Sequence, residues 1–184
     1  YEKTIDFALE YHSDGNGDIK FIGYSLFDTN TKGAYRGNIL QRPEKQRETL
    51  SQYIPISTID NTQKRVQEQL TRIYGNKYRG YLGVDMMVCK SGESYAIHPC
   101  VEVNMRMNMG VLSVILAERY LSENSSATYT IEYCGEHGAA LSKLRMLEKE
   151  HPLQIESGKI VSGAMPLAPT TPSSCYLAYI VELI

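Results

Sequence analysis

The stretch Ile97–Gly110, IHPCVEVNMRMNMG, alternates apolar and polar residues through its centre and then runs into an apolar segment. In a β-strand, side chains two residues apart point to the same face. We therefore expect Glu102, Asn104 and Arg106 to stand in a row on one face, with the apolar residues between them packed into a core. A carboxylate, an amide oxygen and a guanidinium in one row can hold a metal ion beside an anion. A half-buried strand with a solvated polar face is an equally good interpretation of this row alone.

A further carboxylate lies in the preceding apolar run, GYLGVDMMV, where Asp85 falls on the face opposite to most of the apolar side chains. The short connection KSGE at residues 90–93 is typical of a hairpin, so the two strands are predicted to pair antiparallel. That pairing would bring Asp85 beside Glu102 and Asn104. Because magnesium prefers oxygen ligands, these three residues are the candidate metal ligands.

The rest of the chain predicts an α+β fold, an antiparallel β-sheet with packed helices, in one compact unit. Helices are indicated by apolar residues at helical spacing, as in the segment where Ala140, Leu144 and Leu147 are expected to face inward, and strands by alternation. The predicted strands cover residues 3–12, 19–29, 33–40, 80–89, 94–105, 126–134, 159–167 and 174–183. The predicted helices cover residues 43–53, 57–75, 109–121 and 136–149.

Composition narrows the classes of function. The 184 residues carry a formal charge of −2 and no basic block, so a nucleic-acid partner is not indicated. The longest apolar runs are too short to span a bilayer, and no signal peptide is visible, so a cytoplasmic protein is expected. The four cysteines form no C-x-x-C pair, which argues against zinc. Reduced thiols are the simpler interpretation, and disulfides stay open.

The pattern of these residues resembles the C-terminal, metal-binding half of the ATP-grasp superfamily. It consists of a hydrophobic-Asp-hydrophobic-hydrophobic strand, a turn, the sequence Glu-x-Asn-x-Arg and a buried helix. The resemblance is closest across residues 80–116. It implies that Asp85 binds one magnesium ion, that Glu102 bridges two, and that Asn104 binds the second. It also implies a catalytic role for Arg106, against the phosphate or an acyl phosphate.

The resemblance extends less closely to three further residues that would bind the cofactor. Asp6 is similar to an acid that follows the adenine-binding hinge of the family. Arg36 and Lys20 would reach phosphates from the lid side, although solvated strand charges are the simpler explanation of both. On this basis the chain is one partial ATP-grasp-like domain. Its expected parts are lid-like strands (1–42), a helical segment (43–76), the metal-binding strands with the buried helix (77–134), and a helix with a C-terminal hairpin (135–184).

The function implied by the resemblance is that of an ATP-dependent ligase. Such an enzyme converts a small-molecule carboxylate to an acyl phosphate and transfers it to an amine, with ATP and Mg²⁺ as cofactors and Mn²⁺ as an alternative ion. The chain begins at Tyr1, so we expect a fragment that lacks the N-terminal ATP-grasp subdomain and is inactive alone. Some ligases carry an arginine where this chain has Gly83. Two alternatives stay open: a non-catalytic nucleotide- or metal-binding module, and a structural α+β domain.

Overall fold

A computed structural model describes residues 2–29, 35–123 and 125–183. The chain divides into two compact units that are not continuous in sequence. Unit 1 comprises Tyr1–Phe27 and Arg42–Ile115, and unit 2 comprises Asp28–Gln41 and Leu116–Ile184. Each unit combines helices with an antiparallel sheet, so the predicted α+β class is confirmed. Among the helices of the described residues, none has the length and apolar character that a membrane crossing requires.

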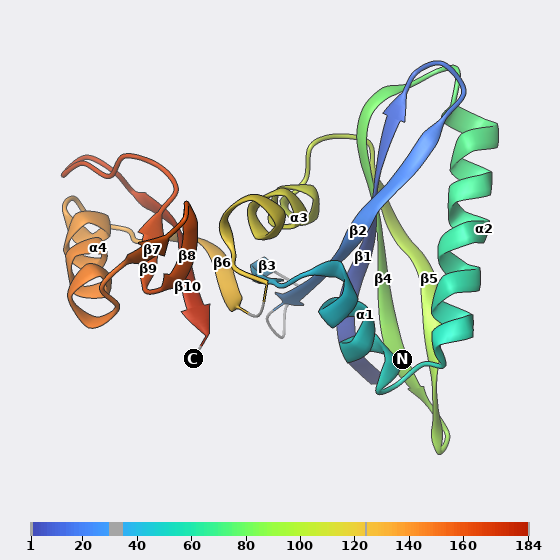
Figure 1. Ribbon diagram of the computed structural model, residues 1–184, viewed down its shortest axis with the longest axis horizontal. Coiled ribbons are helices and arrows are strands. Elements are labelled where there is room, and N and C mark those ends of the chain that lie inside the picture. Colours follow the sequence, from blue (N-terminus) through green and yellow to red (C-terminus); the bar gives the residue numbers. More distant parts are fainter. Residues whose placement is uncertain (1, 30–34, 124, 184) are drawn as a thin grey trace. The chain divides into compact units, whose positions relative to one another are not determined.

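Unit 1 is built on a four-stranded antiparallel sheet with the strand order β5-β4-β1-β2 (Figure 1). The two predicted hairpins, β1 with β2 and β4 with β5, are both present. The strands are β1 (Glu2–Asp14), β2 (Ile19–Thr29), β4 (Arg79–Ser91) and β5 (Ser94–Asn104). The helices are α1 (Pro43–Ser51), α2 (Ile56–Tyr74) and the first part of α3 (Met109–Tyr120), which continues into unit 2.

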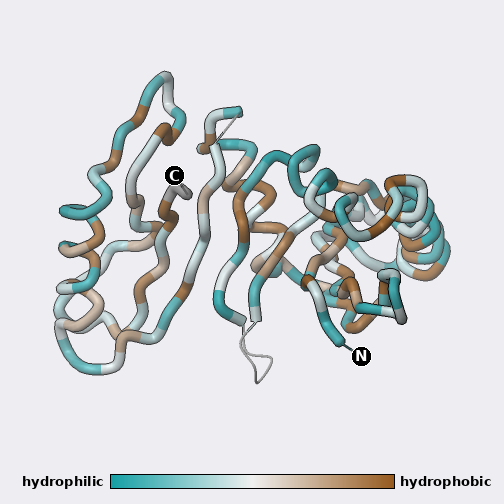
Figure 2. Tube along the Cα trace, turned by 90° about the horizontal axis from the view of Figure 1, so that it is seen from below, coloured by the Kyte–Doolittle hydropathy of each residue, from teal (hydrophilic) through white to brown (hydrophobic). Residues whose placement is uncertain are grey.

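One face of this sheet packs against α2, which lies alongside it (Figure 1). The Tyr11 hydroxyl donates to the carbonyl of Gln63 at 3.1 Å, and the Gln67 amide donates to the carbonyl of Ile19 at 2.8 Å. Hydrophobic residues run along the strands, whereas α2 mixes hydrophobic and hydrophilic residues around its axis (Figure 2). The core on this face includes Phe7, Leu9, Leu26, Leu82, Val84, Met86, Ile59 and Leu70. Burial of these apolar side chains is the main force that holds helix and sheet together.

The expectation that the apolar residues of β5 are packed into a core is wrong. In β5, Val101 is 54% exposed and Val103 is 38% exposed, and Met105, the residue after the strand, is 37% exposed. The reason is that β5 is an edge strand, so neighbouring strands cover only one of its sides. Val103 instead helps to line an apolar groove of about 460 Å³ between β5 and α2, opposite Leu70.

Unit 2 contains a second antiparallel arrangement, with the strand order β3-β6-β10-β9, and a separate β7-β8 pair. Its elements are β3 (Tyr35–Leu40), β6 (Ser126–Tyr133), α4 (Ala139–Glu150), β7 (Gln154–Glu156), β8 (Lys159–Ser162), β9 (Ala164–Pro166) and β10 (Tyr176–Leu183). Helix α4 buries Ala140, Leu144 and Leu147 against Ala164 and Leu177. The inward-facing residues predicted for this helix are therefore confirmed.

Two local details differ from the expected elements. The strand expected at 159–167 is divided at Gly163, whose φ is +96° and where a side chain would overlap the carbonyl of Pro152. Helix α2 begins after Pro55 without a side-chain cap, one residue before the expected start. The first two residues of the strand expected at 33–40 lie outside the described residues.

Candidate metal and phosphate site

The β4–β5 hairpin places the two predicted carboxylate ligands directly opposite each other. Asp85 and Glu102 are Cα partners in this antiparallel pair, and Gly83 and Asn104 form the next pair of the same face. Directly opposed side chains in an antiparallel sheet have Cβ atoms about 4.5–5.5 Å apart. Two like charges at this spacing destabilise the sheet unless a cation or a proton lies between them.

A two-residue bulge in β5 produces this alignment. Between the Met87–His98 pair and the Asp85–Glu102 pair, β4 advances by two residues and β5 by four. The extra residues include Cys100, which has φ of +59°, an uncommon conformation for a residue other than glycine. Without the bulge, Asp85 would face Cys100. Bulges commonly re-aim side chains beside functional sites, and this one brings Glu102 to Asp85.

A chain of hydrogen bonds joins the other two residues to Asp85. The Arg106 guanidinium donates to the Asn104 amide oxygen at 3.1 Å, and the Asn104 amide nitrogen donates to an Asp85 carboxylate oxygen at 3.1 Å. Asn104 is 8% exposed, whereas Glu102 and Arg106 are exposed. The structure thus brings the four residues predicted at the centre of the site onto one face at the end of the hairpin.

The surroundings of Asp85 disfavour its negative charge. Partial burial, followed by the charge of Glu102, raises the pKa of Asp85 from 3.8 to about 6. The hydrogen bond from Asn104 and the charge of Arg106 lower the pKa but do not offset this rise. A divalent cation held by both carboxylates would reverse the effect, because an adjacent positive charge favours the ionised form.

Glu10, on β1, is a buried carboxylate next to this cluster and was not predicted as a site residue. It is 1% exposed and is the Cα partner of Gly83. Its carboxylate accepts hydrogen bonds from the Ser25 hydroxyl at 3.0 Å and from the Asn108 amide at 3.0 Å. Burial is the largest influence on this group and raises the pKa of Glu10 to about 7, and the charge of Asp85 acts in the same direction.

The Glu10 carboxylate fixes the backbone that leads from β5 into α3. The Asn108 amide oxygen accepts from the Val111 N–H at 2.8 Å, so the same side chain binds Glu10 and the first turn of the helix. A side chain at Gly83 or at Gly110 would overlap the Glu10 carboxylate, so both positions require glycine for this close approach. The sequence signal for Glu10 was an acidic residue inside the otherwise apolar run FALEY. Alternation alone does not show that the face of β1 that carries this residue is buried.

The remaining predicted residues are placed differently. Asp6 shares the Asp85 face of the sheet, contributes to the raised pKa of Asp85, and is bound by Lys3 at 2.5 Å. Lys20 lies at the hairpin end of β2, 3.6 Å from Asp18, and is 76% exposed. Arg36 belongs to unit 2, where it lies 3.6 Å from Asp28 on the surface. The described residues contain no group of three or more His, Cys, Asp or Glu side chains arranged for a metal ion, so the proposed set relies on the Asn104 oxygen.

Comparison with known proteins adds information about the fold alone. No protein-family model matches the sequence, and no curated protein does so either. In structure, the chain is similar to N5-carboxyaminoimidazole synthetase from Staphylococcus aureus complexed with ADP, with 14% identity over 99% of this chain and 46% of that chain, at a TM-score of 0.48. It is also similar to L-amino acid ligase from Bacillus licheniformis, with 13% identity over 99% of this chain and 49% of that chain, at a TM-score of 0.48.

A third similar structure is the biotin carboxylase from Campylobacter jejuni in a complex with βγ-ATP. The identity is 11%, the match covers 100% of this chain and 43% of that chain, and the TM-score is 0.46. The chain thus spans less than half the length of these three proteins. The likeness is one of fold alone.

Proposed function

We propose that the β4–β5 hairpin carries the divalent-cation site of an ATP-dependent ligase of the ATP-grasp kind. In this proposal the enzyme forms an acyl phosphate from a carboxylate and transfers it to an amine or a similar nucleophile. The observation that carries the proposal is the direct opposition of Asp85 and Glu102 across the hairpin, with Asn104 bound to Asp85. An opposed acid pair beside an amide oxygen is costly as a purely structural feature and useful as a set of metal ligands.

The side chains fit Mg²⁺, or Mn²⁺ as an alternative. Both carboxylates and the Asn104 oxygen are hard donors, and magnesium usually takes one or two carboxylates and completes its shell with phosphate oxygens and water. Asp85 would hold one ion, Glu102 would bridge two, and Asn104 would serve the second. A cation bound here supplies positive charge that stabilises the developing negative oxygens of a phosphoryl transfer.

Arg106 contributes a fixed positive charge next to these donors. Its guanidinium contacts the Asn104 oxygen and is otherwise exposed, so it can turn toward an anion without breaking a buried contact. A planar guanidinium binds two phosphate oxygens at once, which a lysine ammonium does not. We infer that Arg106 binds the transferred phosphoryl group or the acyl phosphate and orients it for attack by the nucleophile.

Several finer parts of the proposal go beyond this hairpin. We infer that Asp6, on the same sheet face, lies toward the nucleotide, and that a second ATP-grasp subdomain completes the phosphate pocket. Lys20 and Arg36 remain predicted phosphate contacts, with the ion pairs to Asp18 and Asp28 as the simpler role. Small-molecule carboxylate and amine substrates and a cytoplasmic location remain predictions.

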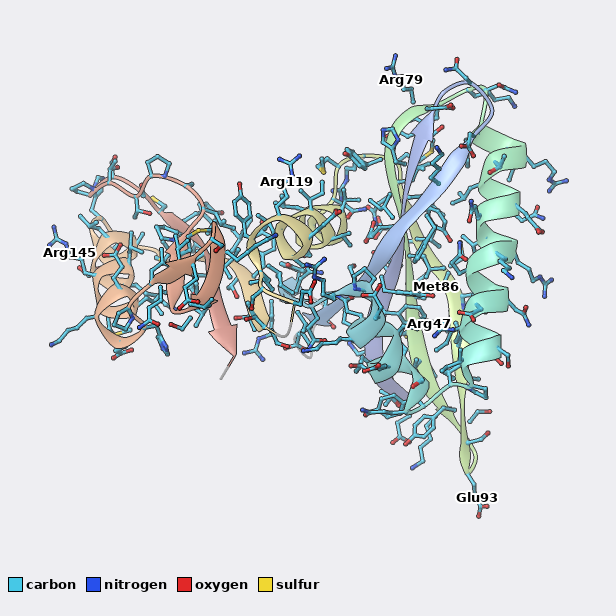
Figure 3. All side chains as sticks on the ribbon, viewed as in Figure 1. Arg47, Arg79, Met86, Glu93, Arg119 and Arg145 are labelled. Carbon is cyan, nitrogen blue, oxygen red and sulfur yellow. The ribbon has the colours of Figure 1, made fainter. Side chains whose placement is uncertain are left out.

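Substitution of Glu102 in the natural protein tests the proposal. We expect Glu102→Ala to abolish carboxylate-dependent ATP turnover and to leave the fold intact, with a metal-free thermal unfolding midpoint that does not fall, because this exposed side chain takes no part in the core and its loss relieves the repulsion with Asp85. The matched control is Glu93→Ala, since Glu93 is exposed at the tip of the same hairpin (Figure 3). Normal turnover in Glu102→Ala contradicts the metal assignment.

The same variants distinguish the alternative functions. A non-catalytic nucleotide- or metal-binding module predicts that Mn²⁺ binding is lost in Glu102→Ala and that the unaltered protein shows no turnover with any carboxylate. If the domain is purely structural, we expect no specific Mn²⁺ binding in the unaltered protein, in Glu102→Ala or in Glu93→Ala.

A further inference from the structure

We propose that Cys134 and Cys175 form a dithiol site that is converted reversibly to a cross-strand disulfide by exchange with a low-molecular-weight disulfide. The pairing of β6 with β10 ends at Tyr133 and Tyr176, which are Cα partners with ring centroids 5.1 Å apart. The two cysteines occupy the next step of the same register. The backbone N–H of Cys134 donates to the carbonyl of Cys175 at 2.8 Å, so the antiparallel alignment continues through the cysteine pair.

This alignment meets the geometric requirement for a disulfide. Opposed residues of a hydrogen-bonded antiparallel pair have Cα atoms about 5.5 Å apart, within the range of about 4.4–6.8 Å that a disulfide spans. Both side chains point to one face, because directly opposed residues share a face of the sheet. On that face Cys134 packs against the cluster that contains Leu177, two residues along β10 from Cys175.

Both sulfur atoms make weak hydrogen bonds, which for Cys134 include one with the backbone of Leu177. The Cys134 Sγ lies 3.6 Å from a Glu132 carboxylate oxygen and 4.0 Å from the Glu132 carbonyl oxygen, and the Cys175 Sγ lies 3.8 Å from the carbonyl oxygen of Ser173. A thiol is a weak hydrogen-bond donor, so little opposes rotation about χ1 in either residue. The proposal requires only such rotations, with the backbone register unchanged.

The other two cysteines lack such a partner. Cys89, on β4, is buried and opposes Lys3 on one side and Ala96 on the other. Cys100 is exposed on the bulge of β5. All four cysteines are free in the structure. The dithiol site is therefore specific to one pair, and no spacing motif in the sequence indicated it.

The difference in exposure between the two thiols sets the order of the exchange. Cys175 is exposed, and its thiolate attacks one sulfur of the external disulfide, RS–SR, so that one RS⁻ leaves and takes a proton from water. Cys134 is half-buried, and its pKa is raised by burial and by the charge of Glu132, so it is the resolving thiol. It loses its proton to solvent and attacks the Cys175 Sγ, which expels the second RS⁻. Two protein thiols are oxidised, and one external disulfide is reduced to two thiols.

The disulfide would join the two ends of the segment that contains α4 and β7 to β9. Its ends already meet in the reduced protein, where the Gly138 N–H donates to the carbonyl of Pro172 at 2.8 Å. The bond therefore requires little native-state rearrangement and mainly restricts the unfolded chain. For a closed loop of this length in a chain of this size, we expect oxidation to raise the unfolding midpoint by roughly 5–15 °C.

The test uses the reduced 184-residue chain, oxidised glutathione as the external disulfide, and maleimide labelling of the remaining thiols. With labelling carried out after unfolding in denaturant, so that the buried Cys89 also reacts, we expect Cys134 and Cys175 to become unreactive, a single cross-linked peptide that contains both, and a higher unfolding midpoint that dithiothreitol reverses. Cys100→Ser should behave like the unaltered chain. Cys175→Ser and Cys134→Ser should each lose the cross-link and the shift in the midpoint.

Three results would overturn the proposal. They are reactive thiols at both Cys134 and Cys175 after equilibration with excess oxidised glutathione, stable glutathione adducts on Cys134 or Cys175 without closure, and a cross-link that includes Cys89 or Cys100. Peptide mapping of the unaltered chain decides among these results even where a serine variant fails to fold.

Discussion

Replacing Glu10 with glutamine should change the pH dependence of stability by a predictable amount. Glu10 is almost fully buried, and its pKa is raised from 4.5 to about 7 in the folded protein. An acid with a raised pKa contributes its full stability below the unfolded pKa and loses it as the pH rises through the folded pKa. The shift corresponds to a loss of about 3 kcal/mol between about pH 4 and about pH 8.

Glutamine preserves the shape of this side chain and removes its charge. Its amide oxygen can accept from Asn108, whose own amide oxygen already accepts from Val111, and its amide nitrogen can donate to the Ser25 hydroxyl. Between about pH 4 and about pH 8, the unfolding free energy of Glu10→Gln should therefore fall by about 3 kcal/mol less than that of the unaltered protein. The difference in unfolding free energy should shift in favour of the variant as the pH rises. Because the pKa of Asp85 is raised to about 6, ionisation of Asp85 should still lower the unfolding free energy of the variant as the pH rises through this value.

Urea unfolding at intervals of half a pH unit measures this difference. The control is Glu93→Gln, an exposed hairpin residue whose profile should match that of the unaltered protein. If Glu10→Gln and the unaltered protein keep a constant difference in unfolding free energy from pH 4 to pH 8, then Glu10 does not titrate in this range and the account of its burial is wrong.

Three further predictions follow from the two units. In the natural protein, Arg106→Lys should lower kcat/KM for ligation by about 10- to 100-fold because it removes a bidentate, charge-assisted contact. Met105→Leu should change only the stability, by less than about 1.5 kcal/mol. Steady-state kinetics of both variants test this prediction, and unchanged kinetics in Arg106→Lys would contradict the catalytic role of Arg106. Leu144 is 8% exposed on the buried face of α4, so Leu144→Ala should lower the unfolding free energy by about 2–5 kcal/mol. Met146 is 48% exposed on the same helix, so Met146→Ala should lower the unfolding free energy by less than about 0.5 kcal/mol. Denaturant titrations measure both values, and similar losses in the two variants would contradict the described core. Residues 1–184 alone should bind Mg-ATP weakly or not at all, and micromolar affinity in calorimetry would show that this chain already holds a complete pocket.

Local periodicity was sufficient to predict most of the secondary structure and the central residues of the candidate site. Alternation around Asp85 and around Glu102, joined by a four-residue connection, indicated a hairpin whose polar faces coincide, and the structure has that hairpin. Helical spacing likewise identified the buried face of α4. These features depend on residues close in sequence, where the period of the pattern directly reports the geometry.

Features that depend on distant residues or on an irregular backbone were not predictable in this way. The direct opposition of Asp85 and Glu102 requires the bulge at Cys100, a residue with no special preference for positive φ. Glu10 became part of the site because a helix that begins about 100 residues later covers its face of β1. The two compact units also interleave along the chain, which no local pattern indicates.

The central claim is that Asp85, Glu102 and Asn104 together bind a divalent cation. Anomalous diffraction from crystals of this chain soaked in Mn²⁺ tests it most directly, because manganese replaces magnesium in such sites and is identified by its scattering. We predict an anomalous peak bound by carboxylate oxygens of Asp85 and Glu102, at about 2.0–2.2 Å, with the Asn104 amide oxygen turned toward the Glu102 carboxylate, where the second ion would bind. A map with no peak between these residues at saturating Mn²⁺, and with the Asn104–Asp85 hydrogen bond intact, would contradict the claim.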